Sequence, residues 1–280
     1  IAALVTGGFL WWKSRGLPQR EGGATLAGLQ APVAVRWDRW AMPYVQAGTA
    51  ADATAALGWL HANDRLFQME ISRRAAAGRL SELFGERALG HDKQVRRLRI
   101  YAAAEKLVAA ASPESRELLA AYARGVNAWI STRNGNLPPE FRLLGAAPEP
   151  WRPADSMGIV FLMARQLSAI FEPNEEELIG FLREFGADRA RELAGTPLAQ
   201  VFAEVERFAV ETPALGESVG RNPEGSGLGS NNWAVGPGRS AARSALVAND
   251  PHLGLGLPGV WFQAALRAPA APGNSSVARG

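Results

Sequence analysis

The stretch Gly229-Ser230-Asn231-Asn232-Trp233-Ala234-Val235 decides the fold that we expect for this chain. It ends a run rich in glycine, serine and proline, residues 216–229, and begins an apolar segment typical of a strand. A second strand is expected at 245–248, after turn residues at 236–240. The pattern therefore predicts an antiparallel hairpin directly after a loose linker.

The centre of this hairpin is expected near Ala241. Because partners in an antiparallel pair lie equally far from the turn, Ser230 and His252 would lie side by side at the open end. A serine hydroxyl there could attack the peptide bond before it or, once freed, an external acyl group. An ordinary hairpin with a serine and a histidine at its frayed ends fits the spacing equally well, so geometry alone leaves both interpretations open.

Composition sets broad limits on the function. The chain has 280 residues, 47% of them hydrophobic, which is enough for one large domain or two small ones. The net charge is +3, and the basic residues are spread out, which indicates a solvated surface and no nucleic-acid partner. The absence of cysteine excludes thiol catalysis, disulfides and cysteine metal sites.

The first residues suggest export. Residues 1–12 are apolar and are followed by Lys13 and Arg15. Twelve residues are too few to span a bilayer, which takes about 20, so we expect the remnant of a signal segment or membrane anchor, with a buried strand as the alternative. The expected location is the bacterial periplasm or the outer side of the inner membrane.

The residues before the linker are expected to be mostly helical. Two short strands are predicted first, at 33–38 and 42–47. Apolar residues at helical spacing then predict several helices: residues 49–77 with Thr49 as N-cap, an amphipathic helix through 96–107, residues 114–130 after the cap Ser112, and a markedly apolar helix from Asp155 to near Pro173, buried on most sides.

These elements give an α+β fold in four parts. We expect residues 1–30 to be the signal or anchor remnant with a connector, and residues 31–210 to form the helical part. Residues 211–229 would be the linker, and residues 230–280 would begin a β-rich part.

Two local patterns are given structural interpretations. His61, Asp64 and Arg65 share the first long helix without metal-binding spacing, so we expect polar side chains held against the core. The GxGxxG pattern at 254–259 lacks a following helix, because Pro258 and the apolar residues 260–262 indicate a loop that enters a strand.

A third pattern stays open. The carboxylates of Glu175, Glu176 and Glu177 stand at the start of an expected helix, where they would favour the helix dipole. A hard cation such as calcium is the functional alternative, and it would need further oxygen ligands from elsewhere in the fold.

Several motifs, taken in order, carry a family resemblance. They are AALGWLHANDRLFQME at 55–70, RR at 73–74, GRLSEL at 78–83, SNNWAV at 230–235, ANDPHL at 248–253 and LPGVWF at 257–262. Together they resemble the penicillin acylases, a group of N-terminal nucleophile hydrolases, over roughly residues 33–265. The resemblance implies a helical α-subunit followed by the start of a four-layer αββα β-subunit.

The resemblance also implies a reaction. A precursor would cut itself between Gly229 and Ser230, giving an α/β heterodimer, and the freed α-amine of Ser230 would act as base for the Ser230 hydroxyl. His252 would orient Ser230, and Asn231 would support the new N-terminus. The mature enzyme would hydrolyse the amide of an N-acyl substrate such as a penicillin or an N-acyl homoserine lactone through an acyl-enzyme.

The remaining site residues follow from the same resemblance. Met163, Gln166 and Leu167 would line the acyl pocket, and Glu175 or Glu176 would bind a structural calcium ion. No organic cofactor is implied, and the oxyanion-hole residues would lie beyond Gly280. A non-catalytic envelope protein that binds a ligand or serves as a scaffold is the alternative, distinguished by the absence of a free Ser230 amine.

Overall fold

The computed structural model describes residues 6–8, 16–133, 136–169, 183, 186, 230–250, 256 and 258–269. The chain divides into two compact units, residues 1–166 with 256–280, and residues 167–255. Helices and strands are both present, as the α+β prediction requires. Within the described ranges, every helix is too short or too polar to cross a membrane.

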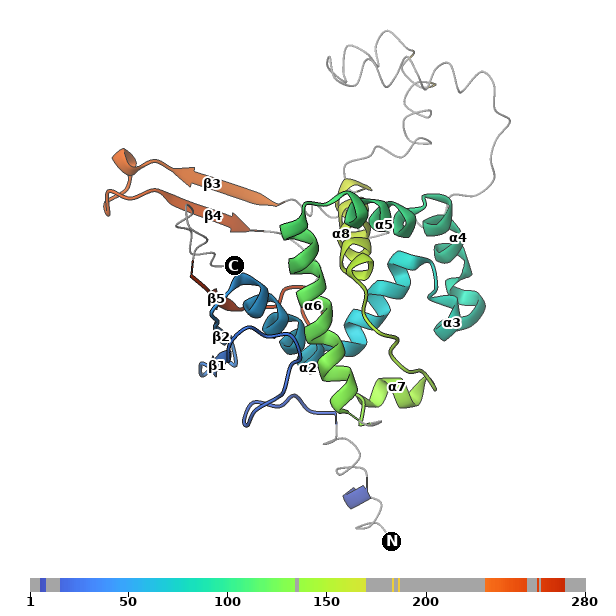
Figure 1. The fold of residues 1–280 in the computed structure, drawn as a ribbon. Coiled ribbons are helices and arrows are strands. Elements are labelled where there is room, and N and C mark those ends of the chain that lie inside the picture. Colours follow the sequence, from blue (N-terminus) through green and yellow to red (C-terminus); the bar gives the residue numbers. More distant parts are fainter. Residues whose placement is uncertain are drawn as a thin grey trace. The chain divides into compact units, whose positions relative to one another are not determined.

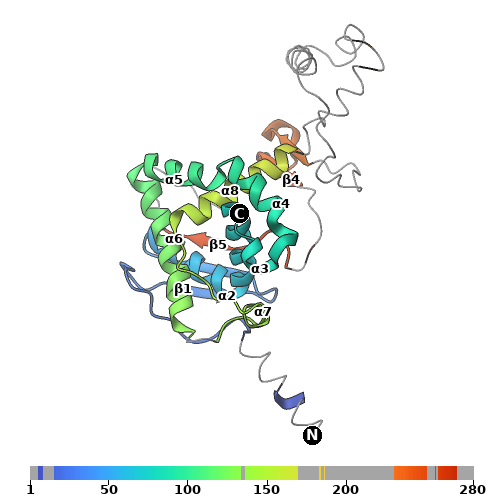
Figure 2. The ribbon, with the colours of Figure 1, turned by 90° about the vertical axis from the view of Figure 1, so that its right-hand side faces the viewer.

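The first unit contains a small three-stranded sheet. Strands β1 (Ala34–Trp37) and β2 (Pro43–Gln46) are antiparallel, which confirms both predicted strands. Strand β5 (Ala265–Arg267) runs parallel to β2 on its other side, with Val45 opposite Leu266. β5 is the red arrow labelled in Figure 2. The predicted loop that enters a strand is confirmed: residues 258–264 are irregular, and the strand β5 begins at Ala265.

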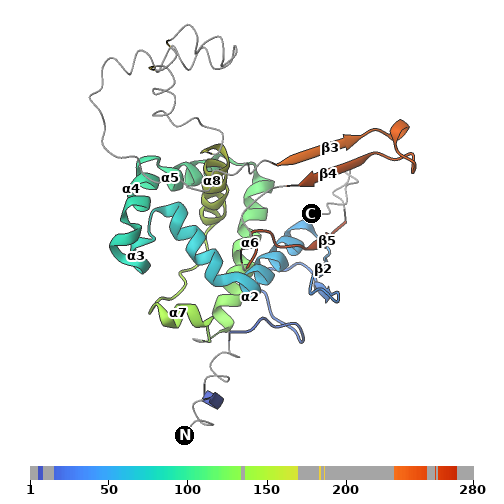
Figure 3. The same cartoon turned by 180° about the vertical axis from the view of Figure 1, so that it is seen from behind.

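Helix α2 (Ala50–Ala77) follows the sheet and is the longest element. It begins as predicted, because the Thr49 side chain accepts a hydrogen bond from the Asp52 amide at 3.1 Å. It ends at Gly78, whose φ of 65° provides a left-handed C-cap. Arg65 has non-helical backbone angles, φ −143° and ψ 22°, so the helix changes direction there (Figure 3).

Helix α6 (Pro113–Thr132) packs against α2 (Figure 1). As predicted, Ser112 caps it by accepting from the Ser115 amide at 3.1 Å. The two helices meet through glycines that leave room for backbone contact. A Cβ at Gly125 would lie 1.8 Å from the Ala55 carbonyl oxygen, and one at Gly58 would lie 2.2 Å from that of Tyr122. Neither position admits a side chain without moving the helices apart.

The remaining described helices cover this pair: α3 (Ser81–Phe84), the 3-10 turn η1 (Gly85–Ala88), α4 (Leu89–Arg97), α5 (Ile100–Ala110), α7 (Pro139–Leu143) and α8 (Pro153–Ala169). The main core lies between α2, α6 and α7, around Leu66, Val126, Trp129 and Phe141. All four of these side chains are almost fully buried.

Two predictions about these helices are wrong. The amphipathic pattern through 96–107 is two helices, α4 and α5, because Arg99 adopts a left-handed conformation with φ 55°. Helix α8 is not buried on most sides: Leu162 is 8% exposed, but Val160 is 53% exposed. The helix packs on one face only, and the predicted end near Pro173 lies outside the described residues.

The second unit contains a hairpin in its described part. Strands β3 (Asn231–Val235) and β4 (Leu246–Asp250) are antiparallel, as predicted. The predicted centre would pair Asn231 with Pro251, whereas Asn231 pairs with Asp250, so the prediction is wrong by one residue. The connection contains the 3-10 turn η2 (Pro237–Arg239) and a left-handed Arg243, which the apolar pattern does not reveal.

Candidate active site

A cavity of about 710 Å³ lies in the first unit, between α2, α6, α8 and residues 260–262. Its wall is mainly apolar. Residues that supply this apolar surface include Met69, Leu118, Ile159, Leu162, Val260 and Phe262. A cavity with a mostly apolar wall and a few polar groups is typical of a binding site for a small organic molecule.

His61 and Tyr122 form a polar pair in this wall. The Nδ1 atom of His61 lies 2.7 Å from the Tyr122 hydroxyl, and its ring meets the Phe262 ring edge-on at 4.5 Å between centroids. Burial, with a smaller contribution from the Arg65 charge, lowers the pKa of His61 to about 4. Burial also raises the pKa of Tyr122. Both side chains are therefore neutral near pH 7.

The structure thus extends the interpretation of the His61 helix. His61 is held against neighbouring side chains, as expected, but it also lines the cavity together with Arg65. A cavity beside these residues could not be predicted from the sequence, because its wall is completed by residues more than 190 positions further along the chain. The one available signal was the cluster of polar residues at 61–65, which follows a largely apolar stretch of the same helix.

Arg65 fixes the segment that closes the cavity on one side. Its guanidinium donates to the carbonyl oxygens of Gly259 and Trp261, the second at 2.8 Å. It also lies 5.3 Å from the centre of the Phe262 ring. Burial lowers the pKa of Arg65, and the carboxylate of Asp64 acts in the opposite direction.

The predicted pocket residues lie on α8. Met163 and Gln166 are on the cavity wall. Leu167, the next residue, is 39% exposed and is not among the residues that line the cavity. The structure thus brings two of the three residues to an apolar cavity, and their role in binding an acyl group stays a prediction.

The predicted nucleophile lies in the second unit. Ser230 is exposed and stands immediately before β3, and Asn231 is the first residue of that strand. Gly229, His252, Glu175 and Glu176 lie outside the described residues, so the roles predicted for them stay predictions. In the described part of the chain, no three His, Asp or Glu side chains are grouped so that they could hold a metal ion.

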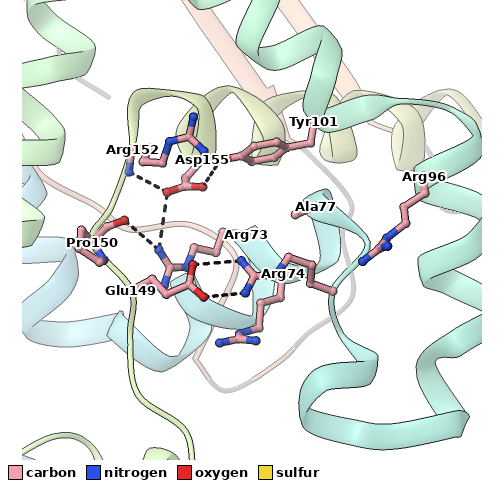
Figure 4. Close-up of a pocket in the computed structure, with 10 residues that line it drawn as sticks. Arg73, Arg74, Ala77, Arg96, Tyr101, Glu149, Pro150, Arg152 and Asp155 are labelled. Atoms are coloured by element: carbon pink, nitrogen blue, oxygen red, sulfur yellow. Dashed lines mark hydrogen bonds and ion pairs between the residues drawn. The ribbon is translucent and has the colours of Figure 1, made fainter.

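A second, smaller cavity of about 190 Å³ is surrounded by a charged network that the sequence analysis missed (Figure 4). Arg73 and Arg74, which line this cavity, share the buried carboxylate of Glu70, at 2.5 Å and 2.6 Å. Asp155 accepts from the Tyr101 hydroxyl at 2.7 Å and lies 3.6 Å from Arg73. The spacing of Glu70, Arg73 and Arg74, three and four residues apart, was the available signal.

The outer part of the network is more exposed. Arg79 pairs with Glu82 at 2.7 Å and with Glu149 at 2.6 Å. The hydrogen bond from Arg79 lowers the pKa of Glu149 to about 2. The ion pairs of Arg73 with Asp155 and of Arg79 with Glu149 connect α2 and the residues after it to α8 and to the loop before α8.

Comparison with known proteins places these features in a family. The family model described as penicillin amidase matches residues 32–277. Penicillin acylase 2 proenzyme from Pseudomonas sp. (strain SE83) is 37% identical over 261 residues, which cover 88% of this chain and 33% of that protein. Acyl-homoserine lactone acylase QuiP from Pseudomonas aeruginosa is 35% identical over 266 residues, covering 90% of this chain and 31% of that protein.

A solved structure agrees. A chain of the thermostable penicillin G acylase from Alcaligenes faecalis aligns with a TM-score of 0.50 and 25% identity, covering 69% of this chain and 98% of that chain. The chain spans about a third of the length of the curated relatives it matches. The family match extends over most of the sequence and includes both the helical part and the hairpin. The chain therefore belongs to the penicillin amidase family.

Proposed function

We propose that this chain is the first part of an amide hydrolase precursor that cuts itself between Gly229 and Ser230. The observation that carries the proposal is the family match over residues 32–277, which includes Ser230 at the start of β3. One relative is itself described as a proenzyme, which supports processing. The finer fold that we propose for the mature protein is a helical α-subunit with a four-layer αββα β-subunit.

The cleavage is an N-to-O acyl shift. The Oγ atom of Ser230 attacks the carbonyl carbon of Gly229, an ester forms, and the bond to the Ser230 nitrogen breaks as that nitrogen takes up a proton. Water then hydrolyses the ester, which leaves the Gly229 carboxylate, the free hydroxyl and the free α-amine. An α-amine has a pKa of about 8 in its ordinary state, so a useful fraction is neutral near pH 7 to 8.

In the mature enzyme the α-amine of Ser230 would accept the hydroxyl proton, directly or through a water molecule. The hydroxyl oxygen would then attack the substrate amide and form an acyl-enzyme that water hydrolyses. His252 would orient Ser230, and Asn231 would support the new N-terminus. The donors that stabilise the oxyanion would come from residues beyond Gly280.

The apolar cavity supports an N-acyl substrate. We propose that Met163 and Gln166 contact its acyl group, with Leu167 beside them, because the cavity wall is apolar and large enough for a chain or ring. Relatives are named as acylases of penicillins and of acyl-homoserine lactones, so both substrate classes belong in the test. Glu175 or Glu176 would contribute to a calcium site, and the protein would act outside the inner membrane.

The deciding experiment is expression of the full-length protein with and without Ser230→Ala. We expect the unmodified protein to give two chains, the second beginning Ser-Asn-Asn-Trp, and to release acid from a panel of N-acyl amides and lactones of graded acyl length. Ser230→Ala should abolish both events. Ser244→Ala, in the turn of the same hairpin, is the matched control and should leave both unchanged. Splitting in the Ser230→Ala protein would refute the proposal.

A further inference from the structure

Contacts within the first unit join two stretches that lie on opposite sides of the proposed cleavage point. The described residues 16–133 and 136–166 precede Gly229, and residues 256 and 258–269 follow Ser230. Strand β5 pairs with β2, and the Ala47 amide donates to the Arg267 carbonyl oxygen at 2.9 Å. After cleavage, this ladder would be an interface between two chains.

Arg65 makes the most specific polar contact of this interface. Both terminal nitrogens of its guanidinium donate to carbonyl oxygens of the later stretch, those of Gly259 and Trp261. The fork of a guanidinium suits two carbonyls that lie two residues apart, which an ammonium group cannot match. The non-helical angles of Arg65 interrupt α2 where this contact is made.

Apolar packing surrounds the contact. Phe262 lies edge-on to His61 and under the Arg65 guanidinium. Phe262 and Leu266 both pack against the core cluster that contains Val45, and Val45 is the partner of Leu266 in the sheet. The later stretch is thus anchored at two points, at Arg65 and at β5, and its residues Val260 and Phe262 complete the cavity wall between them.

We infer that Arg65 is the clamp that keeps the two chains together at the cavity after cleavage, an inference that rests on the proposed self-cleavage. While the chain is intact, residues 170–255 connect the two stretches covalently, so the effective local concentration of the later stretch is high. Cleavage removes the covalent connection through Gly229. The contacts of Arg65 and β5 then hold residues 258–262 in the wall, so Arg65 acts as a positioning residue.

The test separates the clamp from self-cleavage. A recognition sequence for a site-specific protease is inserted between residues 216 and 229 of the full-length Ser230→Ala protein, which is then cut by that protease. Separation of the two chains is followed by size-exclusion chromatography at a urea concentration where the parent pair separates over hours. Failure of the proposed function would be seen independently, as an unmodified Ser230 protein that stays uncut.

We expect Arg65→Ala to speed separation on the order of a hundredfold, since each hydrogen bond from a charged donor is worth roughly tenfold or more. Arg65→Lys keeps the charge without the fork and should fall between Arg65→Ala and the parent. Arg116→Ala is the matched control: Arg116 donates to the carbonyls of Ala109 at 3.2 Å and Ala111 at 2.9 Å, both on its own side of the cut. Its separation rate should stay within about threefold of the parent.

Separation of the Arg65→Ala pair at the rate of the Arg116→Ala pair would overturn the inference. Circular dichroism of the uncut proteins shows whether each variant has folded. If Arg65→Ala does not fold, Arg65→Lys decides by the same comparison, and a rate equal to that of the parent would then overturn the inference.

Discussion

Replacement of Glu70 by glutamine tests the charged network most directly. Glu70 is 1% exposed, and its two partners, Arg73 and Arg74, are 5% and 6% exposed. The substitution keeps the volume of the side chain and removes its charge, so two buried guanidinium groups lose their shared carboxylate. Removing one partner of a buried ion pair costs about 3–5 kcal/mol, because the remaining charge is buried without compensation.

The structure places the expected loss near the lower end of that range. Arg73 keeps Asp155 at 3.6 Å, and Arg74 keeps its ion pair with Glu82, so each retains a carboxylate. We therefore expect the free energy of unfolding to fall by about 3 kcal/mol. The loss is measured by urea unfolding of the full-length Ser230→Ala protein, with circular dichroism and fluorescence required to give the same transition.

Glu117→Gln is the control for this prediction. Glu117 pairs with Arg124 at 2.8 Å, but the two side chains are 56% and 39% exposed, so the pair is worth at most about 1 kcal/mol. Replacing Arg74 by methionine in the Glu70→Gln protein should recover part of the loss, because the buried guanidinium that lost Glu70 is then gone, and Glu82, which is 44% exposed, keeps its ion pair with Arg79. Equal stability of the Glu70→Gln and Glu117→Gln proteins would refute the reasoning.

Three further outcomes are expected from urea unfolding of the same background. Gly125→Ala should lower the free energy of unfolding by about 3 kcal/mol, because its Cβ would overlap a backbone carbonyl of α2. Gly90→Ala, which has open space around it, should raise the free energy of unfolding by up to about 1 kcal/mol. Equal effects of the two substitutions would contradict the close contact between α2 and α6. Ser112→Ala removes the N-cap of α6 and should lower the free energy of unfolding by about 1 kcal/mol, whereas Ser112→Thr should keep most of that stability. An unchanged stability of the Ser112→Ala protein would show that the cap contributes nothing. Folding lowers the pKa of His61 from 6.5 to about 4, so the unfolded chain takes up a proton at this side chain before the folded chain does as the pH falls. The free energy of unfolding should therefore decrease by up to about 3 kcal/mol between pH 6.5 and pH 4. His61→Gln should remove this decrease, and a pH profile that is the same in the variant would contradict a buried, neutral His61.

Local sequence signals were sufficient where the physics is local. Thr49 and Gly78 mark the ends of α2 because a side-chain oxygen satisfies free amides at its start and a left-handed glycine satisfies carbonyls at its end. The turn residues between two apolar segments likewise predicted the β3–β4 hairpin. The order of several motifs was enough to identify the family, which the comparisons confirm.

Other features depended on contacts that no local pattern contains. The register of the hairpin depends on the conformation of residues 236–245, where a 3-10 turn and a left-handed arginine shift the pairing by one residue. The break between α4 and α5 at Arg99, and the face of α8 that stays exposed, depend on which other parts of the fold pack against these helices. Leu167 follows two residues of the cavity wall in sequence, but it does not line the cavity.

The sequence by itself determined the family, through motifs that recur in order along the chain. It also determined the mixed fold, the ends of α2 and α6 and the position of Ser230 before a strand, because each of these depends on residues close together in the chain. Only the tertiary structure decided that Arg65 contacts Gly259 and Trp261, that Glu70 shares its charge between two buried arginines, and that α2, α6 and α8 enclose an apolar cavity with residues 260–262. Those features require side chains from distant stretches to meet, and periodicity reports which face of a helix is apolar without reporting what covers it.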